Sequence, residues 1–162
     1  MGSGTSLSAP LSSLEISGFR NRIPAIDLAV SREQAWRALT HVLATGFAMS
    51  MPAPAGWVLG LSPRRAHGDW TRATLAGNTL PGFAVSDARA PERLTLRGHH
   101  RFSTYALAFE LDSRGGEACT LRARTSAAFP GQTGRVYRSL VIGSGAHRIL
   151  VRRLLRTIAA RA

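Results

Sequence analysis

The stretch GRVYRSLVIGSGAHRILVRRLLRTIAARA, residues 134–162, decides the fold of this chain. Its apolar residues recur every three or four positions, which is the pattern of a helix with one buried face. These positions are Val136, Leu140, Val141, Ile149, Leu150, Val151, Leu154, Leu155 and Ile158. The break Gly143-Ser144-Gly145 divides the stretch, because each glycine inside a helix costs about 1 kcal/mol relative to alanine. We expect a buried C-terminal helix after Gly145, and leave residues 134–145 open between a short helix and a last strand.

A strand and a helix are predicted nearer the start of the chain. Residues 24–30 alternate between apolar and other residues, as in a half-buried strand. Ser31 and Gln34 then have the S-x-x-Q spacing of a capping box, and Gly46 marks the end of the helix. The apolar stripe of this helix comprises Ala35, Trp36, Leu39, Val42 and Leu43. Prolines and glycines within 47–66 exclude one long helix there. The segment is open between a short helix and loop that cover one end of a cavity and a segment whose methionines and tryptophan belong to the core.

The middle of the chain reads as a run of antiparallel strands. The glycines of Ser113-Arg-Gly-Gly116 predict a hairpin between the last two strands, because glycine readily takes positive φ. Strands followed by a long helix indicate an α+β fold and not a βαβ sheet. The predicted strands span 70–76, 82–89, 93–98, 100–112 and 118–129.

Composition bounds the class of protein. With 162 residues, the chain is expected to form a single domain over 19–162, preceded by a flexible segment over 1–18. All 21 basic residues are arginine, which is typical of a GC-rich genome, and they are scattered along the chain, so we do not expect a nucleic-acid partner despite the net charge of +12. No apolar run is long enough to span a bilayer and no signal segment opens the chain. The single Cys119 fits a cytoplasmic protein.

The order of these elements resembles the helix-grip fold of the START-like, polyketide-cyclase-like (SRPBCC) superfamily. The resemblance covers residues 20–162, and the segment Phe129-Pro130-Gly131-x-x-Gly134-x-x-Tyr137, with His147 ten residues later, is similar to a pattern in uncharacterised bacterial members. It implies a curved antiparallel sheet that wraps around the C-terminal helix and leaves an apolar cavity between them. It also implies a small apolar or aromatic ligand as partner. Whether the chain forms a homodimer is left open. The superfamily includes lipid carriers, hormone receptors and cyclases, so the resemblance does not choose one activity.

Side-chain parity indicates which polar groups line such a cavity. On the strand predicted around 99–112, Arg101, Ser103 and Tyr105 share a face with the apolar positions 107, 109 and 111. On the helix, Tyr137 and His147 follow the i, i+3, i+4 spacing of the gripped face. On the partner strand, Cys119, Leu121, Ala123, Thr125 and Ala127 are predicted to point inward, with small residues that leave room for a ligand. The candidate ligand-binding residues are Arg101, Ser103, Tyr105, Tyr137 and His147.

Structural roles compete for the same residues. A helix histidine often bonds a backbone carbonyl, an arginine at a strand end keeps its head in water, and core tyrosines have satisfied hydroxyls. The five histidines show no metal-ligand spacing, and we expect neither a metal nor a cofactor. Cys119 is expected to be an inert core thiol.

Three functions remain at the level of the sequence. The first is a small hydrophobic or aromatic ligand-binding domain without covalent chemistry. The second is a cyclase- or aromatase-like enzyme in which Arg101, Tyr105 and His147 position a polyketide-type or lipid-like substrate and move protons. The third is a structural or interaction protein whose interior is filled by side chains.

Overall fold

The computed structural model describes residues 24–46, 62–63, 65–72, 74–100, 103–128 and 146–162. The expectations for 1–18, for most of 47–66 and for 134–145 therefore lie outside the described residues. The same holds for the bacterial sequence pattern that begins at Phe129.

The first strand and the first helix form where the sequence predicts them. Strand β1 spans Ala25–Leu28 and helix α1 spans Arg32–Gly46. The capping box is made as expected: the Ser31 N–H donates to Gln34 Oε1 over 3.2 Å, and the Gln34 N–H donates to Ser31 Oγ over 3.3 Å. Two backbone donors that a helix start leaves free are thereby satisfied. The predicted apolar stripe of α1 is buried at all five positions.

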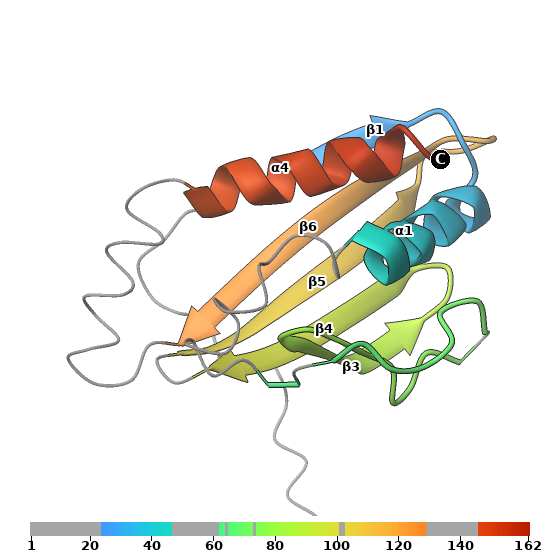
Figure 1. Cartoon of the computed structure of the whole chain (residues 1–162). Coiled ribbons are helices and arrows are strands. Elements are labelled where there is room, and N and C mark those ends of the chain that lie inside the picture. Colours follow the sequence, from blue (N-terminus) through green and yellow to red (C-terminus); the bar gives the residue numbers. More distant parts are fainter. Residues whose placement is uncertain (1–23, 47–61, 64, 73, 101–102, 129–145) are drawn as a thin grey trace, which may run out of the picture.

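The described residues form one six-stranded antiparallel sheet in the order β1-β6-β5-β4-β3-β2 (Figure 1). Strands β2 to β6 follow each other along the chain as neighbours, and β1 closes the far edge beside β6. The hairpin between β5 and β6 is confirmed, with Gly115 and Gly116 at positive φ. The strands are β2 (Thr79–Leu80), β3 (Phe83–Arg89), β4 (Arg93–His100), β5 (Ser103–Ser113) and β6 (Cys119–Ala128).

Two strand predictions are corrected. Residues 70–72 and 76–77 form turns and bends, and the short strand β2 comes later. Asp69 explains the first correction, because its carboxylate accepts hydrogen bonds from both the N–H and the hydroxyl of Thr71 and so folds the chain locally. The strand predicted from His100 begins at Ser103, and His100 belongs to β4 and pairs with Ser103. No glycine, proline or asparagine marks this second hairpin.

The C-terminal helix α4 spans Ala146–Ala159, which confirms a helix that begins after Gly145. It buries Val151, Leu155 and Ile158, at spacings of four and three. Ile149 and Leu150 were predicted on its buried face, but they are 69% and 56% exposed. Their positions on the helix explain the correction, since successive residues turn by about 100° and both lie away from the Val151 stripe.

Helices α1 and α4 lie on the same face of the sheet (Figure 1). Helix α4 contacts α1, β1 and β6, and α1 contacts β5 and β6. We call the covered face of the sheet the inner face and the other the outer face. Within the described part of the chain, no helix is both long and apolar enough to cross a bilayer.

Candidate functional site

The inner face has one end that is completely covered. We call it the hairpin end, because β5 and β6 are joined there. Alternation along β5 brings Phe109 and Leu111 to this face, and the register of the sheet sets Ala123 and Leu121 of β6 beside them. Phe109, Leu121 and Ala123 are fully buried and Leu111 is nearly so. The helices therefore leave no open space for a ligand over these four side chains.

Cys119 belongs to the same covered end. Its side chain is buried, and burial raises the pKa of the thiol because the thiolate loses its hydration. A protonated buried thiol is a poor nucleophile, which supports the prediction of an inert core cysteine.

The opposite end of the inner face is unevenly covered: Thr125 of β6 is exposed, whereas Ser103 of β5 is buried. Thr125 lies on the inner face of β6 beside Leu107, and Ala127 lies beside Tyr105. Thr125 is nevertheless exposed, while Ala127 and Tyr105 are half-buried. Thr125 thus has the inward position that its parity predicts, but neither of the described helices, α1 and α4, buries it. We call this region the open end.

Tyr105 links two parts of the open end through a hydrogen bond and a ring contact. Its hydroxyl donates a 2.8 Å hydrogen bond to the Gly82 carbonyl oxygen, two strands away. Its ring meets Phe83 edge to face, with the ring centroids 5.0 Å apart and the planes at 72°. The two rings form one aromatic wall across β3, β4 and β5.

Gly98 makes this crossing possible. It pairs with Tyr105 on the intervening strand, and a Cβ atom at Gly98 would lie 1.8 Å from the Gly82 oxygen and 2.7 Å from the Tyr105 ring. Any other residue would therefore block the path of the tyrosine. Gly98, Gly82 and Phe83 were not among the predicted site residues. A glycine inside a strand pattern is the signal that could have revealed the close approach.

The structure brings together two of the five predicted site residues. Ser103 and Tyr105 share the inner face of β5, where Ser103 is buried. Arg101 and Tyr137 lie outside the described residues. His147 belongs to the first turn of α4, but the placement of its side chain is not described. Convergence of all five residues stays a prediction.

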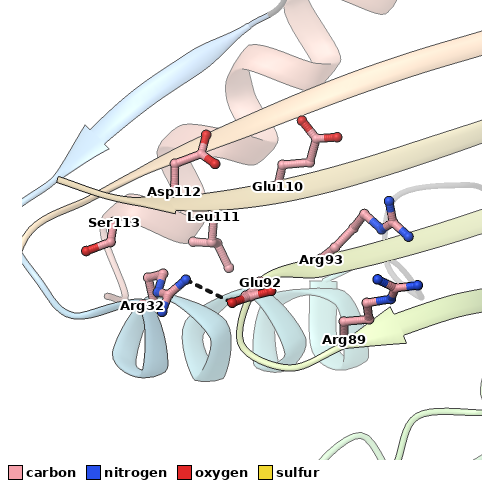
Figure 2. Close-up of a pocket in the computed structure, with 8 residues that line it drawn as sticks. All are labelled: Arg32, Arg89, Glu92, Arg93, Glu110, Leu111, Asp112 and Ser113. Carbon is pink, nitrogen blue, oxygen red and sulfur yellow. Dashed lines mark hydrogen bonds and ion pairs between the residues drawn. The ribbon is translucent and has the colours of Figure 1, made fainter.

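A polar groove of about 430 Å³ lies on the surface near the start of α1 (Figure 2). Its charges are largely neutralised by neighbours: Arg32 bonds Glu92 over 3.2 Å, and Arg93 bonds Asp87 over 2.7 Å. The groove is therefore an ion-pair network at the rim of the sheet, and we assign it no ligand. It is lined by Arg32, Arg89, Glu92, Arg93, Glu110, Leu111, Asp112 and Ser113.

Two exposed carboxylates are held ionised by their neighbours. The Thr120 hydroxyl, followed by Arg114, lowers the pKa of Asp27, which joins β1 to β6. The hydroxyl and N–H of Thr71 lower the pKa of Asp69. Among the described residues, no cluster of three or more histidine, cysteine, aspartate or glutamate side chains could hold a metal ion.

Comparison with known proteins gives a likeness in structure alone. No family model matches the sequence, and no curated protein matches it. Truncated norcoclaurine synthase from Thalictrum flavum superposes with a TM-score of 0.53 at 13% identity, over 85% of this chain and 89% of that one. A point mutant of the same enzyme, in complex with a transition-state analogue, gives 0.50 at 11% identity, over 84% and 91%. This likeness and the observed topology show that the chain has the helix-grip fold, an α+β architecture with a curved antiparallel sheet and a C-terminal helix.

Proposed function

We propose that this chain binds a small hydrophobic or aromatic molecule between the open end of the inner face and α4. The proposal rests on the difference in side-chain burial between the two ends of the inner face. At the hairpin end Phe109 and Ala123 are fully buried, whereas at the open end the inward-facing Thr125 is exposed. A small hydrophobic or aromatic ligand needs unfilled space beside an apolar surface that can bury it.

The chemistry of the open end supports an aromatic or aliphatic ligand. Phe83 and Tyr105 present ring surface, and Ala127 adds a small apolar side chain. The Tyr105 hydroxyl is engaged by the Gly82 carbonyl, so the ring is held in place without depending on a ligand. A rigid aromatic wall loses little entropy on binding, which favours affinity. A transition-state analogue bound by a protein of the same fold also supports a ligand site in this architecture.

The proposal contains no covalent step. Of the three side chains that the cyclase-like alternative uses, Tyr105 donates its hydroxyl to the Gly82 carbonyl, which makes it a weaker candidate for proton transfer. Arg101 and the side chain of His147 lie outside the described residues, so that alternative stays a prediction. We also propose that the chain belongs to an uncharacterised bacterial branch of the START-like, polyketide-cyclase-like superfamily and that it is cytoplasmic. The buried thiol of Cys119 supports the location, since it suits a reducing compartment. The homodimer stays a prediction that sedimentation would test.

The test is a titration with the neutral fluorophore 1-aminoanthracene, which avoids attraction by the positive charge of the chain. Thr125→Trp places an indole at the open end and should weaken binding by about tenfold or more, because it fills the space that the probe needs. The matched control is Thr104→Trp, an exposed position on the outer face of the neighbouring strand β5. The control should bind like the parent. Absence of binding by the parent, or equal binding by both variants, would refute the proposal.

A further inference from the structure

The outer side of α4 combines exposed aliphatic and cationic side chains. Ile149 and Leu150 are the large apolar side chains left exposed in the described part of the chain. Ile149, Arg153 and Arg156 follow i, i+4, i+7 spacing, so they share one stripe. This stripe lies opposite Val151, Leu155 and Ile158, which face the sheet. One side of the helix therefore packs into the core, and the opposite side exposes arginines beside an isoleucine.

The charge on this side is not neutralised locally. Helix α4 contains no acidic residue, and Arg152, Arg153 and Arg156 are all exposed. Among the described residues, none of these three takes part in an ion pair. On the sheet, by contrast, Arg93 and Arg122 are paired with aspartates. The positive potential over α4 is thus available to an anionic partner.

We propose that the outer side of α4 docks onto the surface of a membrane that contains anionic lipids. Phosphate groups of lipids or of nucleic acids would both attract the arginines. A lipid interface also removes Ile149 and Leu150 from water, whereas a nucleic-acid backbone leaves them exposed. Arginine side chains fit the headgroup layer, because their stems lie along apolar surface while their heads stay hydrated. The combination of side chains therefore favours the lipid surface.

The test is co-sedimentation of the full chain with vesicles of phosphatidylcholine, alone or with about one third phosphatidylglycerol. We expect binding to the anionic vesicles only, and weaker binding as salt screens the charges. The double variant Arg153→Gln/Arg156→Gln should bind about 30-fold more weakly, taking about 1 kcal/mol for each arginine near an anionic surface. Ile149→Ser should reduce binding several-fold, since less apolar surface enters the interface.

The matched control is Arg97→Gln/Arg124→Gln, which removes the same charge from exposed positions on the outer face of the sheet. It should keep most of the vesicle binding. An equal loss in both double variants, or binding to neutral vesicles, would show that α4 is not the docking surface. The proposal is also overturned if Ile149→Ser has no effect and the arginine variant instead loses binding to mixed-sequence DNA. Every variant should bind 1-aminoanthracene like the parent, so failure here is distinct from failure of the ligand proposal.

Discussion

The hairpin end and the open end of the inner face are built from the same strands, yet they differ in exposure. Along β6, Leu121 and Ala123 are fully buried, and two residues later Thr125 is exposed. The alternation of side chains is the same at both ends, so local strand structure does not cause the difference. Tertiary packing causes it, because α1 and α4 pack on this face of the sheet and, among the described elements, neither buries Thr125. Stability should therefore depend on one end, and ligand binding on the other.

The largest expected effect is Phe109→Ala at the hairpin end. Phe109 is completely buried, so its truncation should lower the free energy of unfolding by about 3–5 kcal/mol through lost burial and a cavity. Thr125→Ala at the open end is the matched comparison and should change it by less than about 0.5 kcal/mol. Urea unfolding followed by circular dichroism measures both. Similar losses in the two variants would abolish the distinction between the ends.

Gly98→Ala should have the next largest effect. The added methyl would overlap the Gly82 carbonyl and press on the Tyr105 ring, so we expect a loss of about 1–3 kcal/mol in unfolding free energy. Gly77→Ala is unsuitable as a control because its φ is positive. Ala106→Ser, on the outer face of β5, is a better one and should be near neutral. An unchanged stability of Gly98→Ala would show that the two strands do not approach closely.

Tyr105→Phe should sharpen the description of the open end. It removes the hydrogen bond to the Gly82 carbonyl and keeps the ring against Phe83, so a loss of about 1 kcal/mol is expected. Binding of 1-aminoanthracene should be kept, because the wall is aromatic and not polar. A loss of probe binding with unchanged stability would instead make the hydroxyl a ligand contact.

The smallest effect expected concerns pH. The Thr120 hydroxyl and Arg114 lower the pKa of Asp27 in the folded protein. The stability that this carboxylate contributes is therefore present above its unfolded pKa of about 3.9, and is lost as the pH falls through the lower folded pKa. Asp27→Asn should flatten the acid side of the stability profile slightly, since the carboxylate is exposed. Glu117→Gln, an exposed acid in the hairpin turn, is the control. Identical profiles for Asp27→Asn and the parent would contradict the lowered pKa.

Local signals in the sequence were sufficient for several elements. The S-x-x-Q spacing predicted the cap of α1, paired glycines predicted the hairpin between β5 and β6, and Gly145 predicted the start of α4. Each of these depends on backbone conformation or hydrogen bonds within a few residues. The boundary between β4 and β5 was missed because no glycine, proline or asparagine lies between His100 and Ser103 in the sequence. Of the candidate site, Ser103 and Tyr105 were correctly placed on one face, since parity alone determines that.

By itself, the sequence determined which residues alternate, where the helices begin and which faces are apolar. The tertiary structure decided which inner-face residues are covered, so that Thr125 is exposed while Ala123 is buried. It also decided that Tyr105 crosses Gly98 to reach Gly82, and that Ile149 turns to the surface. These outcomes depend on the placement of segments far apart in the chain. Periodicity reports which side of an element is apolar, but cover depends on what packs against that side.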